Sequence, residues 1–492
     1  MSIDNFMILL PILTMFTGAI VILLASMFFD KKLMIFTISS FYLAVICFAI
    51  LNMHAYDSVQ LFSNTYLYSD FGSLLIVFFA IIGIVCILFS CLYYNLAEKQ
   101  LLFGDYAAIT TTILGSAMIL VHSIDIILMF VALETIAICQ YVLVSLPRTR
   151  FSAESAIKYL LNGATATAIF AYGIVFLWGA TASTNILDIG LFITNANDSS
   201  VAILLFSILL ITIGIAFKMG LIPFHGWIPD VYFGGPINVI AFLSTASKGT
   251  AFIFFAIFAM FIIGDKPGSL AIWWSGWLSL IGILSMFLGN ASALQSTNVK
   301  KILAFSSIAH AGYFSLGLVT IILGNSNGLS SVFLYMIAYG CANLLVFFVV
   351  ILNSQSNNNF SLDSFQGLFY RNKILGIFLT IGLLSLTGIP PFAGFIGKFY
   401  LFYNVYNPNY WWTWFLVIFA VLNTVIAAGY YFRWIKIAFT QSNKKINKIH
   451  YSNSVYALLC FLGLFTIIIG LYPNKIIFYS NQMSDFLRIL LS

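Results

Sequence analysis

Long apolar runs alternate along the chain with short polar connections. Most of the runs last about 20 residues, the length at which an α-helix crosses the hydrocarbon core of a bilayer. A transmembrane β-barrel would instead show alternating segments of about 10 residues. The pattern therefore predicts an all-α polytopic membrane protein with about 14 transmembrane helices. Their expected ranges are 4–28, 33–53, 73–95, 106–122, 124–146, 157–180, 200–226, 237–263, 270–294, 302–323, 329–352, 374–405, 411–438 and 455–478.

Prolines should interrupt two of these runs. The seventh run contains "LIPFHGW" at 221–227, and the twelfth contains "IPPFAGF" at 389–395. We expect the helix to break at Pro223 in the first segment and at Pro390 and Pro391 in the second. The two segments align with Pro223 opposite Pro391. Because these runs are an odd number of spans apart, two five-helix repeats in this register would have inverted topology, and broken helices at matching positions of such repeats point to a transport site. The alternative is that Pro–Phe pairs recur by chance in a Phe-rich chain.

The repeat divides the chain into four expected parts. Residues 1–105 hold three N-terminal transmembrane helices, and 106–263 form the first five-helix repeat. Residues 270–438 form the inverted second repeat, and 439–492 hold a loop and the last helix. The N-terminal run has no basic segment before it, so we expect it to be retained as the first span rather than removed as a leader.

Composition and charge agree with this membrane assignment. Hydrophobic residues make up 62% of the 492 residues and charged residues only 7%, whereas soluble domains carry roughly 25% charge. Lysine and arginine are concentrated in alternate connections, which predicts that these connections face the cytoplasm or matrix and that both termini lie on the opposite side. The basic connections contain Lys31, Lys32, Lys99, Arg148, Arg150, Lys300, Lys301, Arg371, Lys373, Lys444, Lys445 and Lys448.

Four charged residues stand inside the apolar runs. They are Glu134, Lys218, Lys248 and Lys398. A charge at a helix centre costs about 2.5–3.5 kcal/mol on insertion scales, so such residues face a polar interior and pair with one another. We therefore predict that Glu134 pairs with Lys218, directly or through one water molecule.

These charges suggest proton chemistry. Burial favours the neutral amine of a lysine, whereas a nearby carboxylate favours the ammonium, so a buried lysine can take up and release a proton as its partner moves. His225 and His310 are possible relay residues, although a helix-packing role is an open alternative for each.

Cofactor and metal motifs are missing from the sequence. The six cysteines include no CxxC pair, and no GxGxxG segment opens a helix after a strand. We expect no redox cofactor and no metal in this chain, and no nucleic-acid partner.

Four segments together carry a family resemblance: "FKMGLIPFHGWIPDVYFGGP", "AFLSTASKGTAF", "KKILAFSSIAHAGYF" and "LLSLTGIPPFAGFIGKFYLF". The chain closely resembles, over nearly its whole length, the N-type antiporter-like subunits (subunit 2) of proton-pumping NADH:quinone oxidoreductase, respiratory complex I. The intramembrane charge axis of that family matches Glu134, Lys218, Lys248 and Lys398. The chain departs from the family pattern after "PDVY", where it has Phe233 and Asn238.

The resemblance implies proton translocation coupled to electron transfer elsewhere in a complex. Other subunits would carry flavin, iron–sulfur clusters and quinone, and the partners would be further membrane-arm subunits, including antiporter-like ones, and lipids. From the placement of these charges inside the apolar runs, we hypothesise that Lys248 is the central relay, that Lys398 is the exchange site toward the far side, and that the Glu134–Lys218 pair is the gate.

Other assignments stay open. They are a subunit of a multi-subunit sodium/proton antiporter, a plastid relative that uses plastoquinone, and a stand-alone solute transporter. The bias toward Phe, Ile and Asn suggests an AT-rich organellar genome, so we expect an organelle-encoded protein of the mitochondrial inner membrane, with the bacterial plasma membrane as the alternative.

Overall fold

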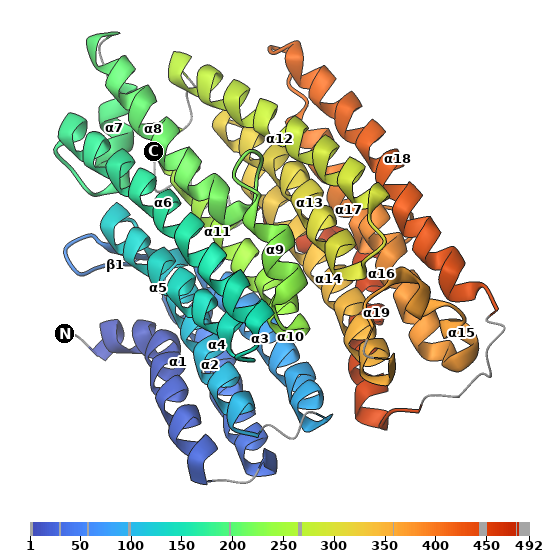
Figure 1. Ribbon diagram of the computed structural model, residues 1–492. Coiled ribbons are helices and arrows are strands. Elements are labelled where there is room, and N and C mark those ends of the chain that lie inside the picture. The colour runs from blue at the N-terminus through green and yellow to red at the C-terminus, as the bar shows by residue number, and fades with distance from the viewer. Residues whose placement is uncertain are drawn as a thin grey trace. The chain divides into compact units, whose positions relative to one another are not determined.

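The protein is almost entirely helical in the computed structural model (Figure 1), which describes residues 3–28, 31–56, 59–96, 100–195, 198–263, 268–357, 359–441, 450–478 and 480–481. Within these ranges 13 helices are long and apolar enough to cross a membrane. They match 13 of the predicted spans. The remaining predicted span, 374–405, is divided into α16 (Lys373–Thr387) and α17 (Ala393–Val405). The predicted all-α polytopic membrane fold is confirmed.

The chain forms two compact units. The first comprises Met1–Lys218 and Gly234–Trp274, and the second comprises Met219–Phe233 and Ser275–Asn481. The first unit contains α1 (Ile3–Phe28), α2 (Lys31–Ala55), β1 (Val59–Leu61), β2 (Tyr66–Tyr68), α3 (Asp70–Leu96), α4 (Gln100–His122), α5 (Ile126–Ser145), α6 (Arg150–Thr181), α7 (Ile186–Thr194), α8 (Asp198–Met219), α10 (Ile237–Phe242), the π-helix η1 (Leu243–Ser247) and α11 (Lys248–Ile263).

The second unit contains α16 and α17. Its other elements are α9 (Trp227–Gly234), most of α12 (Ser269–Gln295), α13 (Val299–Ile322), α14 (Gly328–Asn357), the 3₁₀ helix η2 (Leu362–Phe365), α15 (Leu368–Arg371), α18 (Trp412–Phe439) and α19 (Asn453–Leu471).

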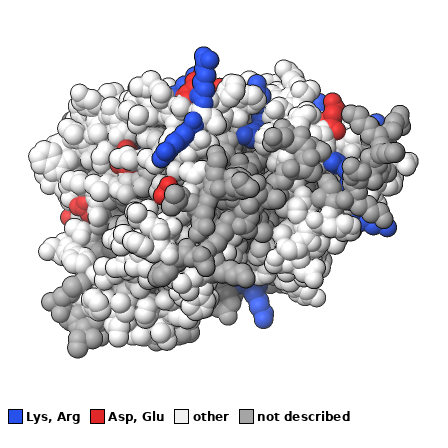
Figure 2. All heavy atoms as spheres, turned by 60° about the horizontal axis from the view of Figure 1, so that its bottom comes forward, with Lys and Arg blue, Asp and Glu red and all other residues white. Residues whose placement is uncertain are grey.

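Burial separates central helices from those that face lipid. In the spans Ile237–Ile263, Val299–Ile322 and Gly328–Ser354, 94% of the most apolar window is buried. In α1 and α18 the corresponding figures are 39% and 33%, and both helices expose large apolar side chains. Figure 2 shows a face on which charged residues are sparse among uncharged ones. The large apolar side chains that α1 and α18 expose suit a hydrocarbon environment rather than water.

Loops on one side of the first unit bond to one another. Tyr66 of the β1–β2 hairpin forms a bridge with Ser123, and Asp125 forms one with Asn185. These residues lie in the connections after the second, fourth and sixth spans, which the sequence placed on the same side. The hairpin was not predicted, because the connection 54–72 has no strong alternation of apolar and polar residues.

A matching construction occurs in the second unit. Asp125 caps α5 by accepting hydrogen bonds from the backbone of the next turn, and Asn298 caps α13 in the same way. Asn298 also forms a bridge with Ser361, as Asp125 does with Asn185. The fifth and tenth spans therefore begin with the same local structure in separate units.

The two predicted helix interruptions are confirmed. Helix α8 ends at Met219 and is followed by Gly220 with φ 75°, and α16 ends at Thr387 and is followed by Gly388 with φ 89°. Glycine adopts this left-handed conformation without steric cost and commonly ends helices. Cis peptide bonds follow at Ile222–Pro223 and Pro390–Pro391.

Candidate functional site

An ion pair lies inside the first unit at the end of α8. The Nζ atom of Lys218 donates a hydrogen bond to Oε1 of Glu134 on α5 at 2.7 Å. Thr167 of α6 donates to the same carboxylate oxygen at 2.9 Å. The side chains of Lys218 and Glu134 are 11% and 19% exposed. The predicted pairing is confirmed, and it offsets part of the cost of placing two charges in an apolar region.

Close packing of α6 and α8 brings these groups together. A Cβ atom on Gly173 would lie 2.8 Å from the backbone nitrogen of Ile211, and one on Gly214 would lie 3.0 Å from the carbonyl oxygen of Ala166. Both glycines are therefore required for the helices to approach this closely. Lys218 then falls in the last turn of α8, where the helix dipole favours a positive charge.

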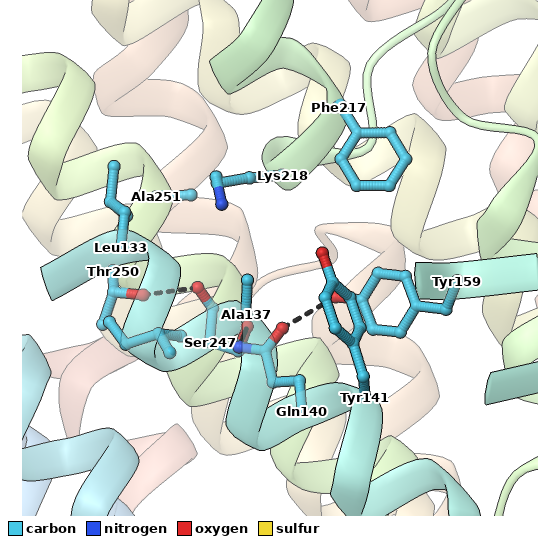
Figure 3. A pocket seen from close by; sticks show the side chains of 11 residues that line it. Leu133, Ala137, Gln140, Tyr141, Tyr159, Phe217, Lys218, Ser247, Thr250 and Ala251 are labelled. Atoms are coloured by element: carbon cyan, nitrogen blue, oxygen red, sulfur yellow. Dashed lines mark hydrogen bonds between the residues drawn. The ribbon is translucent and has the colours of Figure 1, made fainter. Parts of the chain in front are cut away.

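A small polar cavity adjoins Lys218 (Figure 3). The centres of water molecules can occupy about 20 Å³ of it, which is enough for a bound water. In Figure 3 the ammonium of Lys218 points into the space that Gln140 and Ser247 face from the opposite side. The cavity is lined by Leu133, Ile136, Ala137, Gln140, Tyr141, Tyr159, Phe217, Lys218, Ser247, Thr250 and Ala251.

Hydrogen bonds connect the polar walls of this cavity. Tyr159 of α6 donates to Oε1 of Gln140 at 2.7 Å, and Nε2 of Gln140 donates to Oγ of Ser247. Thr250 donates to the carbonyl oxygen of Ser247 at 2.6 Å. Sequence reasoning missed these residues, because uncharged polar side chains are common in the apolar runs and none of them stands out.

Lys248 directly follows a π-helical turn. It is the first residue of α11, is 5% exposed, and its backbone N–H bonds to the carbonyl of Leu243 at the start of η1. Short π segments are rare and frequently occur at functional sites. Lys248 does not line the cavity, but its neighbours Ser247, Thr250 and Ala251 do.

Lys398 is buried in the second unit and is held differently from Lys218. Its Nζ atom donates to the carbonyl oxygens of Leu386 and Thr387, each at 3.0 Å, and lies 4.5 Å from the centre of the Tyr313 ring. The carbonyls belong to the last turn of α16, which the interruption leaves without helical partners. A helix end and an aromatic face thus hold this cation.

His310 lies in a network of hydroxyl groups in the second unit. Its Nδ1 is 2.6 Å from the hydroxyl of Tyr335, and its Nε2 is 3.3 Å from that of Tyr431, which also bonds to Ser306. His225 is half-buried in the segment between α8 and α9. Among the residues that the structure describes, no group of three or more His, Cys, Asp or Glu is placed to hold a metal ion.

Comparison with known proteins gives consistent matches. The family described as NADH:quinone oxidoreductase/Mrp antiporter, transmembrane, matches residues 123–426. NADH-quinone oxidoreductase subunit N 2 of Chloroherpeton thalassium is 33% identical over 90% of this chain and 87% of its own length. The chloroplastic NAD(P)H-quinone oxidoreductase subunit 2 of Mesostigma viride is 35% identical over 82% of this chain and 80% of its own.

Solved structures show the same fold at lower identity. A chain of respiratory complex I from Thermus thermophilus, solved with bound aureothin, matches with a TM-score of 0.77 and 23% identity, covering 95% of this chain and 98% of that one. A chain of the Mrp complex from a Dietzia species matches with a TM-score of 0.82 and 16% identity, covering 99% and 98%. From the matched residues and these relatives, the chain is a member of the NADH:quinone oxidoreductase/Mrp antiporter transmembrane family.

Proposed function

We propose that this chain is an antiporter-like membrane-arm subunit of an NADH:quinone oxidoreductase and translocates protons across the membrane. The observation that carries the proposal is the Glu134–Lys218 ion pair beside a helix end and a water-sized polar cavity. The relatives that are at least 30% identical and span most of the chain are named as subunits of such oxidoreductases, which supports this assignment.

The four intramembrane charges take distinct roles in this proposal. While Glu134 contacts Lys218, the carboxylate stabilises the ammonium; when the two separate, Lys218 releases its proton toward Lys248. Lys248 is the central relay, and Lys398 exchanges protons with the far side. His225 and His310 are possible relays, and the hydroxyl network around His310 would suit that role.

We also propose that residues 106–263 and 270–438 are inverted repeats, preceded by the three helices of 1–105 and followed by 439–492. Two matches support this arrangement. Each proposed repeat contains a helix ended by a left-handed glycine, ahead of Pro223 in the first and ahead of Pro390–Pro391 in the second. In each repeat, the second span also begins with an Asp or Asn residue that caps the helix and bridges to a later loop. By parity of the spans, those two bridges fall on opposite sides.

The chain has no redox role in this proposal. Flavin, iron–sulfur clusters and quinone belong to other subunits, and the partners are membrane-arm subunits and lipids. We place the protein in the mitochondrial inner membrane, with the bacterial plasma membrane as the alternative.

The shared family and the fold of the Mrp chain also suit a sodium/proton antiporter subunit. Native purification followed by mass spectrometry distinguishes the oxidoreductase subunit from the antiporter subunit, because only the oxidoreductase requires companion subunits that carry flavin and iron–sulfur clusters.

The proton path is tested with Lys218→Ala and Lys398→Ala in membrane vesicles that contain the assembled complex. NADH oxidation and proton uptake are measured together. We expect fewer protons per NADH in both variants, because each loses a group that accepts and releases protons.

Full proton stoichiometry in both assembled variants would remove these lysines from the path. If an alanine variant does not assemble, the arginine variant at the same position takes its place. Arginine keeps the positive charge but does not release its proton, so the same loss of uptake is expected.

A further inference from the structure

We infer that Gln140 is a positioning residue that ties the turn before Lys248 to the helix carrying Glu134, so that the gate and the central relay move together. This inference rests on the proposed proton path and assigns a means of coupling to it. It concerns only residues of the first unit.

The amide of Gln140 is engaged at both ends. Gln140 is 3% exposed, its Oε1 accepts from Tyr159 of α6, and its Nε2 donates to Ser247 of η1. One uncharged side chain on α5 therefore joins three elements. Because a buried amide with both ends bonded has one favourable orientation, it fixes the distance between α5 and the π turn. An amide does not titrate, so Gln140 itself carries no proton.

Ser247 provides a polar link from the π turn to another helix. Ser244 and Thr245 donate back to the carbonyl of Ala241 within their own helix, whereas Ser247 reaches Gln140 on α5. Ser247 directly precedes Lys248, and its carbonyl accepts from Thr250 one turn into α11. The position of Ser247 consequently determines the start of α11 and the direction in which Lys248 leaves the backbone.

Helix α5 carries both the carboxylate of the gate and the amide that contacts the π turn. Glu134 and Gln140 are six residues apart on it, which corresponds to about 9 Å along the helix. A displacement of α5 that separates Glu134 from Lys218 also moves Gln140 against Ser247. The cavity lies between these contacts, with Lys218 on one wall and Ser247 on the other. The event that frees the proton on Lys218 therefore also shifts the turn that presents Lys248.

The test is a double-mutant cycle in the assembled complex. Gln140→Met keeps the side-chain length but loses both hydrogen bonds, and Ser247→Ala loses the acceptor. Each is expected to lower protons taken up per NADH by about threefold or more. Because both remove the same contact, the double variant should be no worse than the more severe single variant. Ser145→Ala is the control, since its exposed hydroxyl on α5 bonds only to the carbonyl of Val142.

Rescue distinguishes positioning from simple packing. Ser247→Thr retains the hydroxyl, so proton uptake and its pH profile should stay near those of the wild type. If the methionine variant does not assemble, the comparison of Ser247→Ala with Ser247→Thr takes its place. Wild-type stoichiometry and pH profile in Gln140→Met, additive losses in the double variant, or a threonine variant as impaired as the alanine variant would each overturn the inference. Lys218→Ala is measured in parallel. If it still pumps fully, the proposed function fails; if it does not pump while Gln140→Met does, only this inference fails.

Discussion

Individual buried cations in this chain are stabilised by two different kinds of contact. Lys218 has a carboxylate partner at 2.7 Å, whereas Lys398 is held by two carbonyl oxygens and the ring of Tyr313. When a carboxylate moves away, the charged form of its lysine loses much of its stabilisation. Carbonyls at a fixed helix end do not move away so easily, so the two lysines should respond differently to the same motion.

The ring of Tyr313 provides a residue-level prediction. Tyr313→Phe keeps the aromatic face beside Lys398, while Tyr313→Leu removes it. A cation–π contact contributes about 0.5–2 kcal/mol, so the leucine variant should lower protons taken up per NADH by roughly two- to thirtyfold, and the phenylalanine variant should stay near wild type. Equal uptake in the two variants would show that the ring has no part in holding Lys398.

Charged residues in the site were predictable from the sequence, and uncharged ones were not. Glu134 and Lys218 stand out because charges are rare in apolar runs, and the cost of leaving them unpaired indicated the contact between them. Tyr159 and Tyr335 do not stand out among 25 tyrosines. Only the packed structure shows that their hydroxyl groups bond to Gln140 and His310.

Among the elements, the two interrupted helices are alike in sequence but not in packing. Alignment of the segments makes Gly226 equivalent to Gly394. A Cβ on Gly394 would lie 1.7 Å from the carbonyl oxygen of Ser385, however, whereas one on Gly226 would meet nothing within 4 Å. Gly394 therefore allows α17 to approach the end of α16, and Gly226 has no such role.

These glycines make a matched pair of variants. Gly394→Ala should destabilise the protein by about 1–3 kcal/mol, because the added methyl group forces α16 and α17 apart. Gly226→Ala should change stability by less than about 0.5 kcal/mol. The melting temperature of the purified complex and the amount assembled provide the measurement. A loss that is equal in both variants would contradict the packing argument.

The sequence predicted the helix interruptions because proline and glycine mark them locally. It did not predict the π turn of η1, since "LSTAS" fits an ordinary helix and its contact with Gln140 of a distant helix is not visible in the sequence. The hairpin of β1 and β2 was missed for a similar reason, because Tyr66 and Tyr68 are fixed by packing against His122 from a distant helix.

At the scale of the whole molecule, the distribution of basic residues predicts which side each loop faces. Arg150 begins α6, and Asn195 follows α7 on the side where the bridged loops gather. In a variant without the six native cysteines, we expect Asn195→Cys to react with an impermeant thiol reagent only from outside. Arg150→Cys should react only from the cytoplasmic or matrix side.

Both positions are exposed, so accessibility within the protein does not limit the reaction. Vesicles of known orientation provide the measurement, and permeabilised vesicles provide the control for total reactivity. The reversed pattern of labelling would place the basic loops outside and contradict the assigned topology.

The short ion pair also has an electrical consequence. Moving one elementary charge across the whole membrane potential is worth about 2.3 kcal/mol per 100 mV. Glu134 and Lys218 are 2.7 Å apart, less than a tenth of a hydrocarbon core of about 30 Å. Even if aligned with the field, this dipole gains at most about 0.2 kcal/mol per 100 mV. The transmembrane voltage is thus too weak to open the pair, and the force that separates the two charges must come from movement of the helices that hold them.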